Sequence, residues 1–451
     1  MSKTSGSHSF ETFKLAWPLI ITQVGHVFTG IIDNIFLGQL GVTEQAAGIL
    51  SNNLFVLLLV FCIGVSYATT PLVAGAHEKN DAVLKASYFK NALYLNVAVA
   101  IGCFIILFFA SGLLAHMQQP KDVVKLATPF FDVLIFSLIP LSFFFACKQY
   151  CEGLSNTRIA LIISISGNVM NVILNYCLIY GYCGLPQLGY MGSAWATFFA
   201  RLFMGAGFLI LIFKMPFLGH ISHYWKLVKI NWKQMKELWR IGINSAMQFT
   251  FEIAAFAIAG LMSGSFGKEQ IDAHGIALQI AAFTYMFGSG IGSASTIRTA
   301  KFFANRDWAS IRAASHASIK LVLLVMGAFG ILLLFFNKAL PLAFTNSDEI
   351  ISLSSGLLLI AAMFQLFDGL QVTIIGVLRG LQDTRIPTLV TLIGYWLLAL
   401  PLAYWLAFVQ KLEVIGIWIA LLASLAFVGL SLWWRLYYLL RKNVGKQESA
   451  V

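Results

Sequence analysis

Charged residues are scarce in this sequence of 451 residues, where Asp, Glu, Lys and Arg together make up 11%. An ordinary soluble domain carries about a quarter charged residues, so a soluble globular protein is excluded. The hydrophobic content of 59% and the mean hydropathy of +0.81 indicate many membrane-spanning segments instead. The net charge of +11 is spread over short loops, so nucleic acid is not expected as a partner.

Motifs of soluble catalysis are also missing. The sequence holds no His-Glu-x-x-His zinc motif, no Gly-x-Ser-x-Gly turn and no Walker A loop, because Gly267-Lys268 is followed by Glu269. The six cysteines are dispersed and form no Cys-x-x-Cys or Cys/His metal spacing. We therefore expect no ATP-driven motor, no cofactor and no redox role for cysteine.

Twelve apolar segments, separated by charged or turn-rich breaks, are long enough to cross a bilayer as helices. They lie at residues 15–37, 47–71, 91–113, 126–148, 159–181, 190–213, 241–263, 274–297, 317–336, 350–376, 387–409 and 414–438. The longest polar interruption, Lys214 to Arg240, lies at the centre of the chain. The pattern predicts an all-α polytopic membrane protein with four parts: a six-helix lobe at 1–213, a basic cytoplasmic linker at 214–240, a second six-helix lobe at 241–438 and a cytoplasmic tail at 439–451.

An internal repeat supports two pseudo-symmetric lobes. The stretch Gly153-Leu-Ser-Asn-Thr-Arg-Ile159 recurs as Gly380-Leu-Gln-Asp-Thr-Arg-Ile386, with five identities in seven at an offset of 227. Two weaker matches, Gly38–Gly41 with Gly264–Gly267 and Leu188–Ala196 with Leu412–Ala420, have offsets of 226 and 224. Because each lobe has an even number of spans, the repeat is parallel and its two-fold axis is expected along the membrane normal.

The distribution of basic residues predicts the orientation. With both termini cytoplasmic, 24 of the 30 Lys and Arg residues lie on the cytoplasmic side. The outer side then keeps five lysines, Lys121, Lys125, Lys268, Lys338 and Lys411, and Arg201 lies within a span. We expect an integral plasma membrane protein of a bacterial inner membrane, with both termini in the cytoplasm. Its expected partner is the lipid bilayer, in which it lies as a monomer.

Polar side chains recur at helical spacing within three spans of the first half. The stripes are Thr22, His26, Thr29 and Asp33; Ser164, Asn168, Asn171 and Asn175; and Thr197 with Arg201. A charge at membrane depth costs about 2.5–3.5 kcal/mol on insertion scales, so Asp33 predicts a functional site in a hydrated cleft. The alternative is that these stripes join helices through interhelical hydrogen bonds. If Arg201 reaches Asp33, it would hold that carboxylate in its charged form.

Two further carboxylates lie near the middle of spans in the second half. Glu252 follows Asn244 and Gln248 on one helix face, and Asp368 lies between Gln365 and Gln371 on another. Two carboxylates in one bundle indicate a shared cation, and oxygen ligands suit Na⁺ or H⁺ better than a soft transition metal. Pairing with a buried base is the alternative, although this half offers no Lys or Arg near the middle of a span.

Several of these stretches resemble the multidrug and toxic compound extrusion (MATE) family, in its NorM-like branch. They include Pro18 with Asp33-Asn34-Ile-Phe-Leu-Gly38, Asn171-Val-Ile-Leu-Asn175-Tyr, Gly192-Ser-Ala-Trp-Ala-Thr197, Phe251-Glu252, Asp272-Ala-His274-Gly-Ile-Ala277 and Asp368-Gly-Leu-Gln371. The resemblance implies an antiporter, not an enzyme, that exports amphipathic and mostly cationic drugs against inward Na⁺ or H⁺.

The resemblance also implies residue roles. Asp33, Asn171, Asn175 and Thr197 match the family's first-lobe polar site, and Glu252 and Asp368 match its second-lobe cation site. Gln248, Gln365 and Arg201 are added here as cleft residues from their spacing alone. Two alternatives stay open at this point: a lipid-linked oligosaccharide flippase of the same superfamily, for which a more cationic cavity is expected, and a membrane-embedded enzyme.

Overall fold

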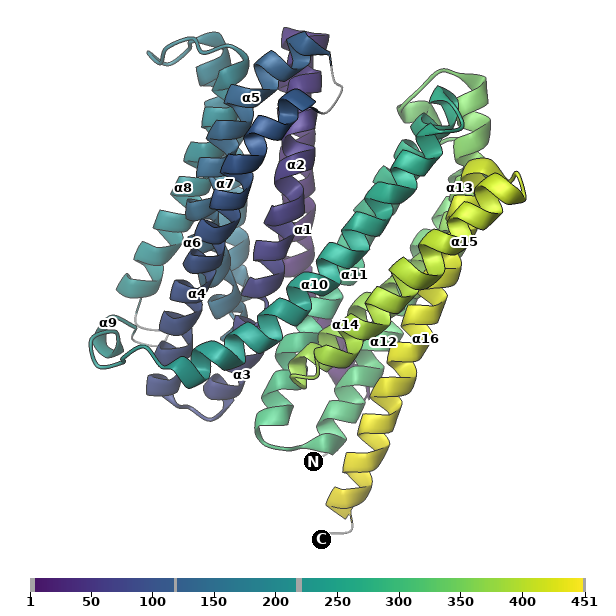
Figure 1. Ribbon diagram of the computed structural model, residues 1–451. Helices are drawn as coiled ribbons and strands as arrows, with labels where there is room; N and C mark the ends of the chain where they lie inside the picture. The colour runs from purple at the N-terminus through teal and green to yellow at the C-terminus, as the bar shows by residue number, and fades with distance from the viewer. Residues whose placement is uncertain (1–4, 117–119, 216–220, 449–451) are drawn as a thin grey trace. The chain divides into compact units, whose positions relative to one another are not determined.

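The structure is a computed structural model that describes residues 5–116, 120–215 and 221–448. All regular structure in these ranges is helical, and long helices account for most of it (Figure 1). The helices are α1 (Ser5–Leu40), α2 (Val42–Ser66), α3 (Thr69–Glu78), α4 (Ala82–Ala110), η1 (Ser111–His116), α5 (Lys121–Phe136), α6 (Leu138–Gly153), α7 (Thr157–Tyr180), α8 (Tyr190–Lys214), α9 (Ile221–Tyr224), α10 (Trp232–Gly264), α11 (Lys268–Ala304), α12 (Trp308–Phe336), η3 (Pro341–Ala343), α13 (Asp348–Gly380), α14 (Arg385–Leu392), η4 (Ile393–Ala399), α15 (Leu400–Tyr404), η5 (Trp405–Val409) and α16 (Glu413–Glu448).

Twelve helical stretches of the described chain are long and apolar enough to cross a membrane, which confirms the predicted all-α polytopic fold. Most extend beyond the predicted spans; the second, for example, runs over Val42–Glu78 rather than 47–71. Polar residues can continue a helix through the headgroup layer, which adds about 10–15 Å to a hydrocarbon core of about 30 Å. Hydropathy therefore locates the apolar centre of each helix and not its ends.

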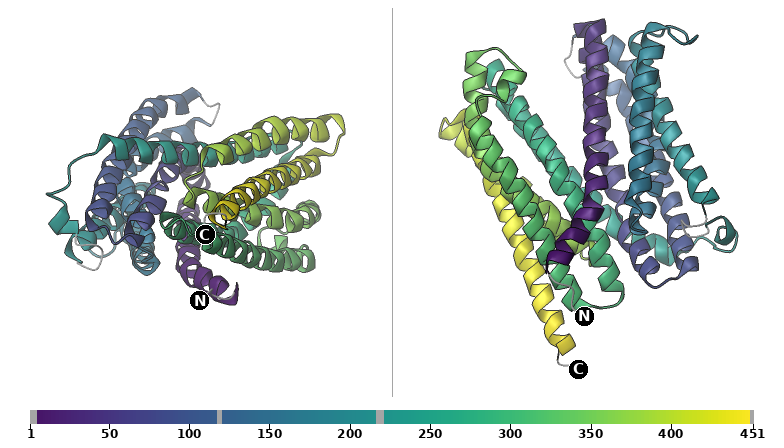
Figure 2. Two further views of the ribbon diagram at one scale, coloured as in Figure 1. Left: turned by 90° about the horizontal axis from the view of Figure 1, so that it is seen from below. Right: turned by 180° about the vertical axis from the view of Figure 1, so that it is seen from behind.

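The chain divides into two compact units. One is formed by Ile21–Ala246, and the other by Met1–Ile20 together with Met247–Val451. The helix α1 is shared, because its first half packs with the second of these units: Ala16 and Leu19 lie in one buried cluster with Ile291 and Met326 (Figure 2). The beginning of α1 and the end of α16 lie at the same end of this unit (Figure 1).

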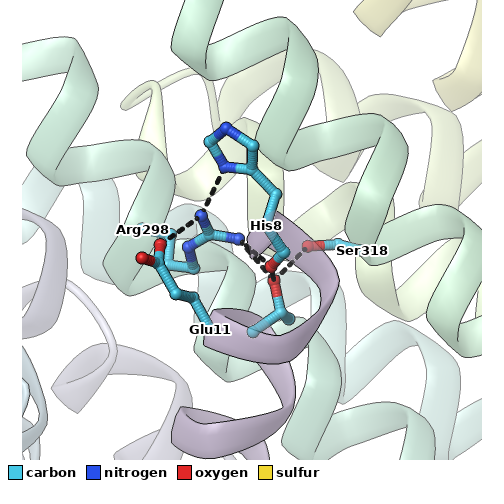
Figure 3. A network of polar contacts seen from close by, with 5 residues as sticks. His8, Glu11, Arg298 and Ser318 are labelled. Carbon is cyan, nitrogen blue, oxygen red and sulfur yellow. Dashed lines mark hydrogen bonds and ion pairs between the residues drawn. The ribbon is translucent and has the colours of Figure 1, made fainter. Parts of the chain in front are cut away.

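A buried arginine of α11 forms hydrogen bonds with the beginning of α1. The Arg298 guanidinium donates to the His8 carbonyl at 2.6 Å, to the Thr12 hydroxyl at 2.6 Å and to a Glu11 carboxylate oxygen at 3.0 Å (Figure 3). It also lies 2.7 Å from His8 Nδ1. Arg298 itself is 4% exposed. Because the Glu11 carboxylate and neutral acceptors surround this buried cation, its charge is compensated within the unit.

The predicted repeat is visible in the backbone. Residues with left-handed φ angles recur as Asn80 (53°) with Arg306 (55°), Ser155 (61°) with Gln382 (61°), and Gly184 (76°) with Lys411 (56°). Each second residue follows the first by 226 or 227 positions, the offset of the sequence repeat. The capping bonds recur as well: Asp81 accepts from the Leu84 amide at 2.8 Å, and Asp307 accepts from the Ser310 amide at 3.0 Å. The two halves therefore share their turns as well as their helices.

The motif Gly-Leu-x-x-Thr-Arg-Ile carries a glycine because helices meet closely there. A Cβ atom on Gly153 would lie 3.1 Å from the Thr70 carbonyl oxygen, and one on Gly380 would lie 2.8 Å from the Thr296 carbonyl oxygen. Any side chain at either position would push the two backbones apart. The same steric requirement thus accounts for both copies of the glycine.

Hydrogen bonds join the linker between α8 and α10 to α4, within the unit of Ile21–Ala246. The Lys90 ammonium of α4 donates to the carbonyl oxygens of Trp225 and Val228 at 3.0 and 2.8 Å. The Asn231 side chain accepts from the amides of Lys233 and Gln234, which begins α10 at Trp232. The last residues of the predicted linker are therefore helical.

Candidate functional site

The first polar cluster joins α1, α7 and α8 inside the unit of Ile21–Ala246. The Asp33 carboxylate accepts a hydrogen bond from Asn175 Nδ2 at 2.7 Å on one oxygen and from the Thr197 hydroxyl at 3.2 Å on the other. Asn171 Nδ2 donates to the same hydroxyl at 3.2 Å. All four side chains are at least nine-tenths buried. We call these residues the Asp33 cluster.

Helical spacing accounts for this arrangement. Asn171 and Asn175 are one turn apart on α7, and Asn175 Nδ2 also contacts the Asn171 side-chain oxygen at 3.2 Å. Asn175 Oδ1 is buried and has no hydrogen-bond partner among the described residues. Because a buried carbonyl oxygen without a donor is costly, this atom is available to a ligand or a water molecule in the cluster.

The rest of the predicted first-half stripes lie outside the Asp33 cluster. The Thr29 hydroxyl donates back to the Gly25 carbonyl at 3.0 Å, and the Ser164 hydroxyl donates to the Ala160 carbonyl at 2.8 Å. The His26 ring packs edge-on against Phe144 at 6.0 Å. These contacts are within one helix or between neighbouring helices, as the packing alternative expects.

Arg201 does not form an ion pair with Asp33 in the described part of the chain. Its guanidinium donates to the Ser137 hydroxyl at 2.5 Å and lies over the Phe55 ring at 4.8 Å. The ion pair between Arg201 and Asp33 that the sequence analysis considered is therefore not seen.

The second polar cluster lies in the other unit and joins α10, α13 and η4. One Glu252 oxygen accepts from the Tyr395 hydroxyl at 3.1 Å and from Gln371 Nε2 at 3.3 Å. The Tyr395 hydroxyl also lies within hydrogen-bond distance of both ends of the Gln371 amide. We call Glu252, Asp368, Gln371 and Tyr395 the Glu252 cluster.

Asp368 brings a second carboxylate to this cluster. It is 4% exposed and lies about one helical turn before Gln371 on α13, near enough to Glu252 for two charged carboxylates to repel each other. One turn away on α13, Gln365 is fully buried, and neither its amide nitrogen nor its amide oxygen has a partner among the described residues. Gln248 lies about one turn before Glu252 on α10 and donates to Thr391 Oγ1 at 3.4 Å. The structure therefore brings the two carboxylates together with several neutral oxygen atoms.

Tyr395 was missed by the sequence analysis. It lies in η4, a π-helical stretch of the eleventh span, where the wider turn changes which residues face α10 and α13. A signal was available, because Tyr395 follows Thr391 by one helical turn in an otherwise apolar segment. A tyrosine at membrane depth is common in packing, however, and the π-helical register cannot be read from hydropathy.

The sequence matches the MatE family over two segments, residues 18–177 and 245–405. Together they cover well over half of the chain, and they begin 227 positions apart, as the internal repeat does. The chain belongs to the MatE family. The Asp33 cluster and the Glu252 cluster thus lie in the two MatE segments, except that Thr197 follows the end of the first one.

Curated MatE relatives match along nearly their whole length. The multidrug resistance protein NorM of Burkholderia vietnamiensis is 31% identical over 439 residues, with 95% of this chain and 94% of that protein covered. The probable multidrug resistance protein NorM of Brucella suis is 28% identical over 439 residues, with 95% and 93% covered. This MatE protein is therefore similar to NorM proteins from end to end.

Solved structures show the same fold. The eukaryotic MATE transporter AtDTX14 superposes with a TM-score of 0.88 at 18% identity, with 98% of this chain and 99% of that chain covered. A MOP superfamily transporter from Pyrococcus furiosus, for which a reverse polarity of the binding pocket suggests a different function, has a TM-score of 0.88 at 16% identity, with 97% and 96% covered. At these identities the likeness establishes the architecture of this MatE protein and not its substrate.

Proposed function

We propose that this protein is a cation-coupled antiporter that exports amphipathic, mostly cationic drugs and xenobiotics by alternating access. The names of its NorM relatives, which are multidrug resistance proteins, support export of drugs. Both clusters place buried carboxylates among amide and hydroxyl groups, which suits reversible binding of a cation.

One observation carries the proposal: the buried carboxylates are not neutralised by bases. Among the described residues, no ion pair joins Asp33, Glu252 or Asp368 to a lysine or an arginine. The hydrogen bonds to Asp33 and Glu252 come from the neutral donors Asn175, Thr197, Gln371 and Tyr395. Because an isolated charge is costly at membrane depth, each cluster favours an exchangeable cation that completes it.

In this proposal the Glu252 cluster binds the coupling ion. Glu252 and Asp368 repel each other when both are charged and their surroundings are of low dielectric constant. Na⁺, or a proton on one carboxylate, relieves this repulsion. The side-chain oxygens of Gln371, Tyr395 and Gln365 can add hard ligands, which favours Na⁺ over H⁺. A Na⁺ ion is a transported substrate here and not a resident cofactor.

The Asp33 cluster is proposed to bind the substrate or a second cation within its own unit. A cationic drug would pair with the Asp33 carboxylate, while the free Asn175 oxygen would accept a hydrogen bond from an ammonium group. Neutral donors around Asp33 lower the cost of the empty carboxylate without occupying the place of the cation. This combination suits reversible binding better than a permanent ion pair does.

Coupling follows if drug and ion stabilise different conformations of the units. A cation entering from outside then favours release of drug outside, and release of the cation inside restores the affinity for drug. Linkage requires reciprocity, so bound drug must weaken cation binding by the same factor. We further propose a monomer in a bacterial inner membrane. The distribution of basic residues supports the placement of both termini in the cytoplasm.

Efflux from proteoliposomes tests the function directly. Drug-loaded vesicles are given an inward Na⁺ gradient and, separately, an inward proton gradient. Na⁺-dependent efflux that is lost in both Glu252→Gln and Asp368→Asn supports the proposal. Glu349→Gln and Asp348→Asn are matched controls, because these exposed carboxylates lie at the start of α13.

Three outcomes are distinguishable. Intact Na⁺ dependence in the Glu252→Gln/Asp368→Asn double variant would contradict the site assignment. Efflux driven only by the proton gradient would keep the site and change the ion. Absence of drug efflux under either gradient, combined with translocation of a lipid-linked oligosaccharide, would replace the antiporter with the flippase.

A further inference from the structure

The turn that follows α7 holds two cysteine side chains against each other. Cys177 lies in the last turn of α7 and is 4% exposed, whereas Cys183 lies in the connection to α8 and is exposed. Their sulfur atoms are 3.3 Å apart. The spacing of six residues is not a recognised motif, so the sequence alone did not point to this pair.

Backbone contacts hold the turn without any bond between the sulfurs. Gly181 has a left-handed φ of 78°, and the amides of Gly181 and Tyr182 both donate to the Cys177 carbonyl, at 2.9 and 3.0 Å. The amide of Leu188 donates to the Leu178 carbonyl at 2.8 Å. The Tyr182 ring stacks on Tyr176 with 4.9 Å between ring centres. The two thiols are thus brought together by the fold itself.

The remaining cysteines differ in their surroundings. Cys62, Cys103, Cys147 and Cys151 are buried within membrane-spanning helices. Their burial shields them from thiol oxidants in the aqueous phase. Cys183 lies instead in a loop that the proposed orientation places outside the plasma membrane, where the environment is oxidising.

We propose that Cys177 and Cys183 form a disulfide bond in the mature protein. A disulfide is about 2.05 Å long, and the two sulfurs already lie 3.3 Å apart, so a small approach of the sulfurs closes the gap. The oxidant is a protein disulfide of the thiol–disulfide exchange class. The exposed Cys183 thiolate attacks one sulfur of this donor disulfide, and a mixed disulfide forms.

The Cys177 thiolate then attacks the Cys183 sulfur, and the donor leaves as a dithiol. Two S–H bonds are lost and one S–S bond forms. The two electrons reduce the donor disulfide, whose sulfurs take up the two protons. The new bond closes a short ring around the end of α7, two residues beyond Asn175, and so holds the helix end that carries part of the Asp33 cluster.

Differential alkylation tests the proposal. Cells that produce the full-length protein are quenched in acid, and free thiols are blocked with N-ethylmaleimide under denaturing conditions before digestion and mass spectrometry. We expect Cys177 and Cys183 to be modified only after reduction. Cys62, Cys103, Cys147 and Cys151 are internal controls that should be modified without reductant. Modification of Cys177 and Cys183 without reductant would overturn the proposal.

A second measurement separates the bond from the packing of the two side chains. Dithiothreitol should lower the apparent Tm of the wild-type protein in detergent, while the Cys177→Ser/Cys183→Ser variant should show no response to it. A Tm that responds equally in both proteins counts against the bond. If the thiols are free and an impermeant maleimide labels Cys183 only in inverted vesicles, the orientation is wrong, and drug efflux as proposed above is untouched.

Discussion

At the scale of single residues, the two clusters use different chemistry. Asp33 is one carboxylate held by an amide and a hydroxyl, each bonded to a different oxygen. Glu252 shares its surroundings with a second carboxylate, Asp368, and Gln371 and Tyr395 both donate to a single Glu252 oxygen. The Glu252 cluster therefore favours a bound cation more strongly than the Asp33 cluster does, because its two charged carboxylates repel each other when no cation is bound.

Asp33→Asn should abolish drug export while the protein is still produced and folded. The change removes the charge that a cationic drug would pair with, but it keeps the size of the side chain. Efflux assays and thermal unfolding in detergent measure the two properties. Asp122→Asn, at an exposed position of α5, is the matched control. Wild-type export by Asp33→Asn would show that the Asp33 cluster only joins helices.

Thr197→Val should strengthen binding of a cationic drug by about tenfold, because the empty Asp33 carboxylate loses one of the neutral donors that stabilise it. A hydrogen bond to a charged group contributes about 1.5–3 kcal/mol, and the valine keeps the shape of the side chain without its donor. The apparent KM of efflux reports the change. Thr128→Val is the control, because the Thr128 hydroxyl only donates back to the Val124 carbonyl at 3.0 Å. An equal shift of the apparent KM in Thr128→Val would contradict this role of the Thr197 hydroxyl.

Tyr395→Phe should raise the external Na⁺ concentration needed for half-maximal efflux by about tenfold, because the ion loses the Tyr395 hydroxyl as an oxygen ligand. The phenylalanine keeps the ring contact with Phe256 at 6.0 Å between centres. Tyr404→Phe, at an exposed position of the same span, is the control. An unchanged Na⁺ dependence would place Tyr395 outside the ion site.

The residues themselves were largely predictable. Asp33, Glu252 and Asp368 are charges in apolar spans, and the amides and hydroxyls around them recur at helical spacing. Their pairing was not predictable, because helical spacing tells which residues share a face and not which faces meet. The lack of an ion pair between Arg201 and Asp33 illustrates this limit, as Arg201 bonds to Ser137 instead.

At the scale of elements, the repeat duplicates turns but not chemistry. With the offset of 226 positions, His26 corresponds to Glu252, and Asp33 corresponds to Ala259. With the offset of 227, Phe144 corresponds to Gln371, and Leu141 corresponds to Asp368. The His26–Phe144 ring contact thus takes the place that the Glu252–Gln371 bond has in the other unit. Equivalent helices therefore carry different polar residues.

The shared turns make a prediction about stability. Gln382 has a φ of 61°, which costs a side chain with a Cβ atom about 1–2 kcal/mol. Gln382→Gly should raise the apparent Tm, and Gln382→Val should lower it, because a β-branched residue fits this region poorly. Thermal unfolding in detergent measures both. Asn305, where φ is −96°, is the control position. There the Gly variant should not have a higher apparent Tm than the Val variant for this reason. The same order of Tm values at Asn305 and Gln382 would contradict the explanation.

At the scale of the whole molecule, the orientation in the membrane is open to a direct test. In a cysteine-free background, cysteines at Asp122 and Gln410 should react with an impermeant maleimide added to intact cells. Cysteines at Lys229 and Arg312 should react only in inverted vesicles. All four positions are exposed, so accessibility within the protein does not bias the result. The reverse pattern would place the termini outside.

The sequence by itself determined the membrane class, the number of spans, the repeat and which carboxylates lie within apolar spans. These follow from composition, hydropathy and internal similarity, which are properties of the chain alone. Only the tertiary structure decided that Asp33 meets Asn175 and Thr197, that Tyr395 joins Glu252, and that Cys177 meets Cys183. The physical reason is that such contacts depend on the rotation of each helix about its axis, on a π-helical stretch and on a turn with a left-handed residue. Helical periodicity constrains none of these three.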